Sequence, residues 1–255
     1  MRIMRDYTRP VHIKSYDVDT RRQLKVSTLL AMCQESSEQQ LKQFGLDHAA
    51  LMQQDIAFLL ARVKIDFHKV PLEGQDVTLS VCPRGAQGAQ YFREFQMFAG
   101  DELLVEVIES WILVQMSSRA ILPPSTMDHL EIDIDSHRGK WKGRLGRIKM
   151  PKDLPLLATR RIYYSDLDFN GHVSNIHYAR FLLDALPSFS QYNPDPELQL
   201  PPPKTLRSLS MNYISESKWG DELRIYGCED EQTFYLYGEN VNGRSVECCG
   251  EFSCE

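Results

Sequence analysis

Ser165-Asp-Leu-Asp168 repeats the earlier segment Tyr16-Asp-Val-Asp19, and each aspartate of the later pair lies 149 residues after its counterpart. A second set of matches lies downstream at an offset of 146 residues, where Leu60, Val63, Ile65, Phe67 and Gly74 align with Leu206, Leu209, Met211, Tyr213 and Gly220. A loop insertion or deletion explains the small change in offset. Two matches in the same order predict that the chain is an internal duplication.

Both halves show the same order of predicted elements. In the first half, Ser27 is the expected helix N-cap and Gly45 the expected end of that helix. In the second half, Ser174 or Asn175 is expected to cap a helix that Pro187 stops. Each helix is followed by runs with alternating apolar residues, which predict strands at residues 63–67, 77–81, 95–97, 105–116, 209–213, 223–225, 234–236 and around 246. One long helix against an antiparallel sheet, repeated twice, is an α+β architecture.

The repeats predict two domains joined by a linker. We expect an N-terminal domain over residues 1–125, a linker over 126–157 and a C-terminal domain over 158–255. The linker contains a basic run, Arg138 to Lys152, with seven Lys or Arg residues and no acidic residue. A run of this kind is typical of a solvated linker, and its alternative interpretation is a docking surface for an acidic partner.

Composition excludes several classes of protein. The chain has 255 residues, 42% of them hydrophobic and 25% charged, which is typical of a globular protein rather than a disordered or fibrous one. Its net charge of −6 argues against general affinity for nucleic acid or an anionic membrane. No apolar stretch approaches the ~18 residues of a membrane span, and the first residues do not resemble a signal peptide, so we expect a cytoplasmic protein. The six cysteines lack Cys-x-x-Cys spacing, so no metal site is expected.

The densest polar segment lies directly before the second predicted helix. Asp168, Asn170 and His172 stand at alternate positions there, so in an extended segment their side chains point to the same side. The helix N-terminus that follows offers backbone N–H groups suited to stabilising an oxyanion. The alternative interpretation is a capped turn with one structurally satisfied histidine.

The first half lacks these groups. The offset of 149 places Arg21 and Gln23 where the second half has Asn170 and His172. Likewise, the offset of 146 places Val70 where the second half has Glu216, although an isolated glutamate is more often solvated than catalytic. This asymmetry predicts an active second half and a degenerate first half.

Three segments of the chain resemble the acyl-ACP thioesterase family. Asp166-Leu-Asp-Phe-Asn-Gly-His-Val-Ser-Asn-Ile-His-Tyr178 is similar to the family signature that precedes its central helix. Residues 110–123 resemble the family's Trp-containing strand, and residues 209–217 resemble a segment that ends in Glu-Cys in the family. The resemblance implies two tandem hot-dog domains, with the acyl-chain pocket in the N-terminal domain and catalysis in the C-terminal domain.

The resemblance also implies site residues. Asp168, Asn170, His172 and Glu216 match the family's catalytic set, whereas the family's cysteine falls on Ser217. The loss of that cysteine favours attack by water, with Glu216 as general base or water-positioning group. In this hypothesis Asn170 and His172 position the water and polarise the substrate, and Asp168 orients one of them. Whether Ser217 participates stays open.

The implied activity is hydrolysis of fatty acyl thioesters of acyl carrier protein (ACP) in fatty acid biosynthesis, with no cofactor. The acidic ACP is the expected partner, and the run Arg138 to Lys152 is its candidate docking surface. The chain is expected to act as a monomer or homodimer. The alternatives are an acyl-CoA thioesterase of the same fold, a hot-dog hydratase or dehydratase, and a non-catalytic protein that binds acyl thioesters. Candidates for the acyl tunnel, each of which could also be plain core, are Leu29, Leu30, Cys33, Phe58 and Trp111.

Overall fold

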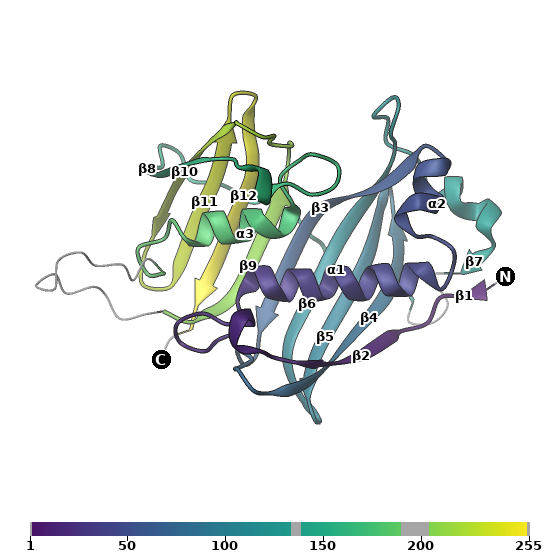
Figure 1. Cartoon of the computed structure of the whole chain (residues 1–255), viewed down its shortest axis with the longest axis horizontal. Coiled ribbons are helices and arrows are strands. Elements are labelled where there is room, and N and C mark those ends of the chain that lie inside the picture. The colour runs from purple at the N-terminus through teal and green to yellow at the C-terminus, as the bar shows by residue number, and fades with distance from the viewer. Residues whose placement is uncertain (1, 134–138, 190–203, 254–255) are drawn as a thin grey trace, which may run out of the picture. The chain divides into compact units, whose positions relative to one another are not determined.

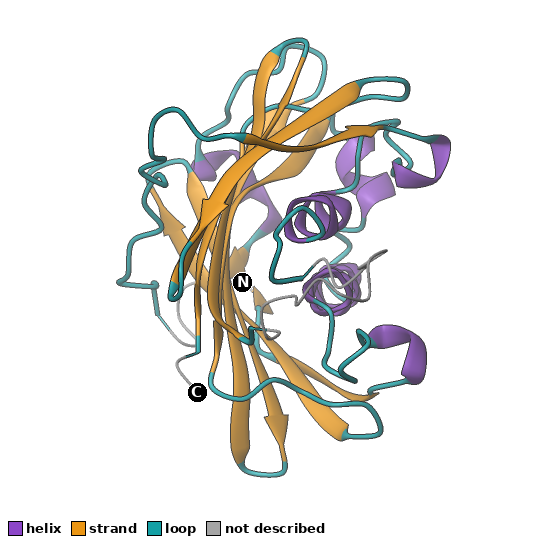
Figure 2. Cartoon of the chain, turned by 90° about the vertical axis from the view of Figure 1, so that its left-hand side faces the viewer, coloured by secondary structure: helices purple, strands orange, loops and turns teal. Residues whose placement is uncertain are grey.

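The computed structural model describes residues 2–133, 139–189 and 204–253. The chain divides into two compact units, Met1–Leu145 and Gly146–Glu255. Each unit consists of an antiparallel sheet with a long helix across one of its faces (Figures 1 and 2). None of the helices in the described part of the chain combines the length and apolar character needed to cross a bilayer.

The sheet of the N-terminal unit has the strand order β2-β4-β5-β6-β3. Its strands are β2 (Tyr7–His12), β3 (Ile56–Phe67), β4 (Asp76–Gln87), β5 (Gln90–Ala99) and β6 (Glu102–Gln115). The smaller elements are β1 (Arg2–Ile3), β7 (Ile132–Asp133), α2 (His48–Gln53) and two 3-10 helices, Ser15–Asp17 and Pro124–Leu130. Alternate strand residues such as Ile65, Phe95 and Val107 are buried, because they form the face of the sheet that packs against the helix.

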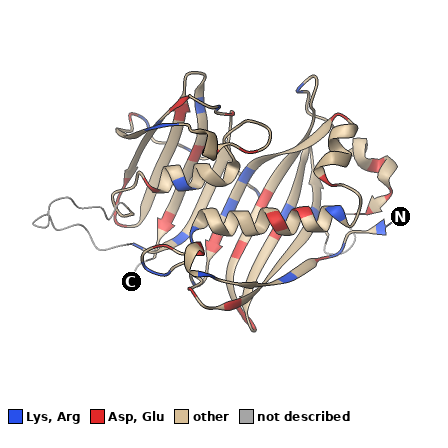
Figure 3. Cartoon of the chain, viewed as in Figure 1, with Lys and Arg blue, Asp and Glu red and all other residues tan. Residues whose placement is uncertain are grey.

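Helix α1 (Val26–Lys42) covers that face and is amphipathic. Leu29, Leu30 and Cys33 are buried, whereas Glu35 and Glu38 are exposed. Figure 3 shows acidic residues in red along α1. Apolar residues spaced by three and four positions form one stripe of a helix, and burial of this stripe fixes α1 on the sheet.

The C-terminal unit repeats this plan with the strand order β9-β12-β11-β10-β8. Its helix is α3 (Asn175–Leu183), preceded by the 3-10 helix Tyr164–Asp166. Its strands are β8 (Leu156–Arg161), β9 (Leu206–Tyr213), β10 (Glu222–Glu229), β11 (Thr233–Asn240) and β12 (Gly243–Phe252). The core includes fully buried Leu182, Leu209, Phe234 and Leu236.

Backbone pairing confirms the duplication. The bridge between Val18 and Leu24 recurs between Leu167 and Val173, at the offset of 149. The bridge between Gln23 and Leu72 recurs as His172 with Lys218, so the downstream segment keeps its offset of 146. The α+β architecture predicted from the repeats is therefore confirmed in both units.

The predicted N-cap of the first helix is wrong. Ser27 lies inside the first turn, and the N-cap is Lys25, whose side chain makes no capping hydrogen bond. The backbone decides the entry point, because the N–H of Leu24 donates to the Pro71 carbonyl (2.8 Å) and that of Lys25 to the Asp17 carbonyl (3.1 Å). The helix ends at Lys42, before Gly45.

The described part of the basic run, residues 139–152, follows the N-terminal sheet and has no helix or strand. Arg138 lies outside the described residues, and the other six basic side chains are exposed: Lys140, Lys142, Arg144, Arg147, Lys149 and Lys152. Trp141 packs against Phe92 with ring centroids 5.0 Å apart. Arg62 donates a hydrogen bond from Nη1 to the Leu145 carbonyl (2.7 Å). These contacts hold the first part of the run to the sheet while its charges face solvent.

Candidate active site

Residues 166–174 form a tight loop that gathers the predicted polar side chains. The N–H of Asp168 donates to the His172 carbonyl (2.8 Å), and the N–H of Gly171 donates to the Asp168 carbonyl (3.0 Å). Gly171 has a φ of +77°, the left-handed region that glycine enters without steric cost. The chain therefore reverses direction between Asp168 and His172.

The Asp168 carboxylate stabilises this loop by accepting hydrogen bonds from its backbone. Its Oδ1 accepts the N–H of Asn170 (2.8 Å) and, at 3.4 Å, that of His172. Its Oδ2 lies 3.4 Å from the amide nitrogen of Asn170, so the carboxylate also orients that side chain. Asp168 thus fixes both residues that follow it at alternate positions.

Glu216 reaches the same loop from the segment that follows β9. The N–H of Val173 donates to the Ser217 carbonyl (2.9 Å), which aligns the two segments. As a result, Nε2 of His172 lies 3.1 Å from Oε2 of Glu216. The imidazole is 19% exposed and the carboxylate 39%, so both groups are open to a substrate. The structure brings Asp168, Asn170, His172 and Glu216 into one connected cluster.

Ser217 faces the interior instead of this cluster. It is fully buried, and its hydroxyl accepts a hydrogen bond from the Asn240 amide nitrogen (3.0 Å) and lies 3.3 Å from the Ser245 hydroxyl. Its N–H donates to the Tyr178 hydroxyl (3.0 Å). These contacts are structural. Because the Ser217 hydroxyl is fully buried, a thioester does not reach it.

We expect Ser217→Ala to keep kcat for acyl-thioester hydrolysis within about threefold, because a fully buried hydroxyl does not meet the substrate. The free energy of unfolding should fall by about 1–2 kcal/mol, since the Asn240 amide nitrogen loses one of its two acceptors. Steady-state kinetics and urea denaturation measure the two effects. A loss of activity by several orders of magnitude without unfolding would instead make Ser217 the nucleophile.

Two further residues hold the backbone at Glu216 in place. Neither was predicted as a site residue from the sequence. The amide nitrogen of Asn240, at the end of β11, also donates to the Glu216 carbonyl (3.1 Å). Tyr178, on α3, binds the next peptide through its hydroxyl. Tyr178 belongs to the family-like signature, whereas Asn240 carries no recognisable sequence signal, because its contact depends on tertiary structure alone.

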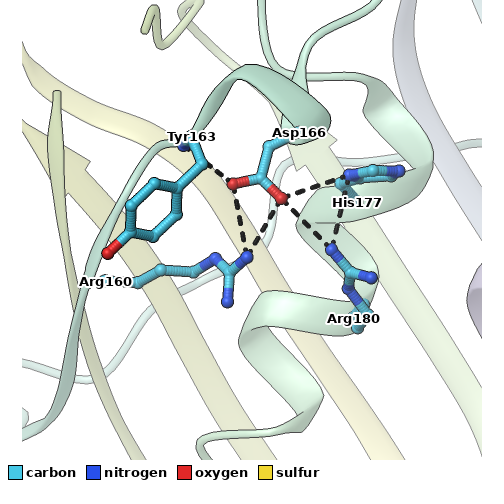
Figure 4. A network of polar contacts seen from close by, with 5 residues as sticks. All are labelled: Arg160, Tyr163, Asp166, His177 and Arg180. Carbon is cyan, nitrogen blue, oxygen red and sulfur yellow. Dashed lines mark hydrogen bonds and ion pairs between the residues drawn. The ribbon is translucent and has the colours of Figure 1, made fainter. Parts of the chain in front are cut away.

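Asp166 forms a second polar network at the base of the loop (Figure 4). It is 1% exposed, and its carboxylate accepts hydrogen bonds from Nη2 of Arg160 (3.0 and 3.2 Å) and Nη2 of Arg180 (3.3 Å). It also accepts the N–H of Tyr163 (3.0 Å) and lies 3.6 Å from Nδ1 of His177. Burial alone raises the pKa of Asp166, but the Tyr163 N–H and the Arg160 guanidinium lower it overall. The carboxylate therefore stays ionised and ties β8 to α3.

This network closes the loop that carries the candidate site. The Asp166 carbonyl accepts the N–H of Ser174 (3.1 Å), so the loop begins and ends at the same anchored point. The N–H groups of Asn175 and Ile176, in the first turn of α3, have no acceptor within the helix. They are the groups that the sequence predicts could hold an oxyanion.

The N-terminal unit keeps the loop but not its functional groups. The Asp19 carboxylate accepts the N–H groups of Arg21 (2.8 Å) and Gln23 (3.0 Å), as Asp168 does for its own loop. Arg22, with a φ of +61°, takes the place of Gly171. The Arg21 guanidinium pairs with Asp19 (3.2 Å), and neither Gln23 nor Val70 can reproduce the imidazole–carboxylate contact. The repeated Asp-x-Asp therefore supports the loop in both halves, and the imidazole–carboxylate contact of His172 and Glu216 is found in the second half.

Among the described residues, no group of three or more His, Cys, Asp or Glu side chains is arranged to hold a metal ion. The site consists of a carboxylate, an imidazole, an amide and the orienting Asp168.

Comparison with known proteins identifies the family. The acyl-ACP thioesterase N-terminal domain matches residues 5–125, and the acyl-ACP thioesterase C-terminal domain matches residues 157–237. The chain belongs to the acyl-ACP thioesterase family. Two chloroplastic acyl-[acyl-carrier-protein] hydrolases of Cuphea viscosissima, FATB3 and FATB1, are 20% and 22% identical to it over 69% of its length. The alignments cover 46% and 45% of these relatives, so the chain spans about half their length.

Solved structures show that the fold of this acyl-ACP thioesterase family member is the tandem hot-dog fold that the resemblance implied. An acyl-ACP thioesterase from Bacteroides thetaiotaomicron matches with a TM-score of 0.81 at 20% identity, over 97% of this chain and 98% of that one. The 12:0-ACP thioesterase from Umbellularia californica matches with a TM-score of 0.81 at 16% identity, over 98% of both chains.

Proposed function

We propose that this protein hydrolyses fatty acyl-ACP to free fatty acid and ACP in fatty acid biosynthesis. The observation that carries the proposal is the contact of 3.1 Å between His172 and Glu216, beside an Asn170 that Asp168 orients. These groups stand only in the second half of a duplicated member of the acyl-ACP thioesterase family.

In the proposed mechanism, water attacks the thioester carbonyl. Glu216 accepts a proton from the water, and Asn170 and His172 position the water and polarise the carbonyl. The oxyanion is held by N–H groups at the start of α3. The intermediate then collapses, the carbon–sulfur bond breaks, and the ACP thiolate takes up the proton. This chemistry needs no metal or redox cofactor.

We assign the acyl chain to the N-terminal unit, whose own loop is degenerate. Leu29, Leu30 and Cys33 are buried on α1, while Phe58 and Trp111 are half-buried on the facing side of the sheet. This arrangement supports an apolar binding region beneath α1. In this proposal residues 1–125 hold the chain, residues 126–157 link the domains and residues 158–255 carry catalysis.

The exposed basic side chains between Lys140 and Lys152 support a docking surface for the acidic ACP. Replacing Lys142, Arg147 and Lys149 together by glutamate should raise KM for acyl-ACP by about 10- to 100-fold at low salt, with kcat little changed. The reason is that reversed charges repel the carrier before the chemical step. KM for an uncharged acyl-N-acetylcysteamine thioester should stay the same, because that substrate lacks the carrier.

A matched variant tests whether net charge alone causes the effect. Glutamate at three exposed basic positions elsewhere gives the same net charge: Lys42, Arg207 and Arg224. We expect this control to leave KM for acyl-ACP nearly unchanged. Equal KM values for the two triple variants would place the carrier elsewhere.

The test of the proposed function is release of free fatty acid from medium- and long-chain acyl-ACPs and from the matching acyl-CoAs. Faster hydrolysis of acyl-ACP supports the proposal. Faster hydrolysis of acyl-CoA would assign the chain to the CoA carrier, and binding without hydrolysis would make it a binding protein.

We place this activity in the cytoplasm, in a monomer or homodimer. The five cysteines within the described ranges are not in disulfides, which suits a reducing compartment: Cys33, Cys82, Cys228, Cys248 and Cys249. The sixth, Cys254, lies outside the described residues.

A further inference from the structure

A charged pair lies on the side of the N-terminal sheet that faces α1. Arg93 on β5 and Glu109 on β6 are direct cross-strand partners. Glu109 is 3% exposed, and its Oε2 accepts the indole N–H of Trp111 (2.9 Å). The neighbouring positions on this face are apolar, among them buried Phe95 and Val107. Charged groups cost free energy in such surroundings.

Helix α1 adds polar groups directly above the pair. Nη1 of Arg93 donates to the Ser37 carbonyl (3.4 Å). Burial raises the pKa of the Cys33 thiol, and the nearby Glu109 carboxylate raises it further, which places Cys33 beside the same cluster. Burial also raises the pKa of Glu109 to about 7, against the influence of Trp111 and Arg93. The Glu109 carboxyl group is thus poorly solvated.

Two polar atoms of α1 in this region lack hydrogen-bond partners among the described residues: the Ser37 hydroxyl and the side-chain carbonyl oxygen of Gln40. Both residues are buried, Gln40 completely. The Gln40 amide nitrogen is used, since it donates to the Arg5 carbonyl (2.7 Å), so its carbonyl oxygen is held in place without a donor. A buried acceptor without a donor is costly, and a bound ligand with a hydroxyl would supply the missing donor.

The sheet face around Arg93 and Glu109 contains side chains that are only half-buried. Arg93, Trp111, Tyr91 and Phe58 keep part of their surface accessible, although their strand positions lie on the α1 side of the sheet. Phe58 and Tyr91 pack against a buried cluster that includes Leu51 and Leu113, and Arg93 and Trp111 lie half-buried beside them. We expect an apolar chain that packs on Trp111 to bring a polar group to Arg93 and Glu109.

We propose that Arg93, Glu109, Ser37 and Gln40 form a binding site for a hydroxyl group on the acyl chain, so that the preferred substrates are hydroxyacyl thioesters. A hydroxyl donates one hydrogen bond and accepts up to two, so it can donate to Glu109 or to Gln40 and accept from Arg93 and Ser37. A neutral group also suits a pair whose charges cancel, whereas a carboxylate would meet the negative charge of Glu109. The inference rests on the proposed assignment of the acyl chain to the N-terminal unit.

The test compares dodecanoic acid with its positional hydroxy isomers by titration calorimetry on the full chain. We expect one isomer to bind about tenfold more tightly than dodecanoic acid, as one well-made hydrogen bond allows. Glu109→Leu should remove the preference, and Glu109→Gln should keep part of it, because the amide still offers an acceptor. Ser37→Ala provides the same test if Glu109→Leu does not fold. Glu106→Gln, on the opposite face of β6, is the matched control and should keep the full preference.

The outcomes separate this inference from the proposed function. Equal affinity for all isomers, with acyl-ACP hydrolysed, would overturn the hydroxyl site and leave the function standing. Selective binding that Glu109→Leu abolishes supports the site even if no thioester is hydrolysed. A preference that survives both Glu109→Leu and Ser37→Ala would place the hydroxyl elsewhere and overturn the inference.

Discussion

Replacing Glu216 by glutamine should lower kcat for acyl-ACP hydrolysis by about a hundred- to a thousandfold, with KM changed by no more than a few-fold. Glutamine keeps the size and hydrogen-bonding reach of the side chain but cannot accept a proton from water. The contact of 3.1 Å with Nε2 of His172 places the carboxylate in the cluster, so its chemistry changes while the loop stays in position. Steady-state kinetics on a purified acyl-ACP measures the effect.

A matched control for this variant is Glu222→Gln, an exposed glutamate at the start of β10. It should retain wild-type kcat, because its side chain lies outside the candidate site. Full activity in Glu216→Gln would remove the general base from the mechanism and leave Asn170 and His172 as the only groups available to handle water.

The second large effect concerns stability. Asp166→Ala should lower the free energy of unfolding by about 2–3 kcal/mol, because the Tyr163 N–H and the partly exposed Arg160 and Arg180 lose the buried carboxylate that they bind. Urea denaturation followed by circular dichroism measures this loss. Activity should fall as well, since the same residue anchors both ends of the loop that carries His172.

The duplication supplies the control for Asp166. Asp17 occupies the equivalent position, and its carboxylate accepts the N–H of Lys14 (2.9 Å) without the arginine contacts described for Asp166. Asp17→Ala should therefore cost about 1–2 kcal/mol. Equal losses for the two variants would show that Arg160 and Arg180 add nothing to the stability of the loop.

The pH dependence of the Asp166 contribution has a definite sign. Because the pKa of Asp166 is lowered in the folded protein, its contribution is present above the pKa of an unfolded aspartate, about 3.9, and is lost as the pH falls through the folded-state pKa. The difference in stability between wild type and Asp166→Asn should therefore shrink on acidification below about pH 4.

The local features of the fold could be predicted from the sequence because they are periodic or repeated. The apolar pattern predicted strands β3 to β6 and β9 to β12 but missed β2 and β8. The offsets of 149 and 146 predicted both the duplication and the loop that contains Asp168. The helix start at Val26 was missed because tertiary backbone pairing fixes it, not the capping propensity of Ser27.

The candidate site also contains some residues that could be predicted from the sequence and others that could not. Asn170 and His172 stand close together in sequence and differ from the first half, so comparison of the halves pointed to them. The Arg160–Asp166–Arg180 network, the support that Asn240 gives to Glu216 and the Arg93–Glu109 pair join different strands and helices. No spacing in the sequence encodes such contacts, and they emerge only when the elements pack.

The most direct test of the account is release of free fatty acid from acyl-ACP by the wild type and by His172→Ala, measured side by side on protein of equal thermal stability. The account predicts turnover by the wild type and a loss of at least about a hundredfold in the variant, because the imidazole that meets Glu216 is gone. Equal turnover by the two proteins would contradict it and move catalysis away from the loop that precedes α3.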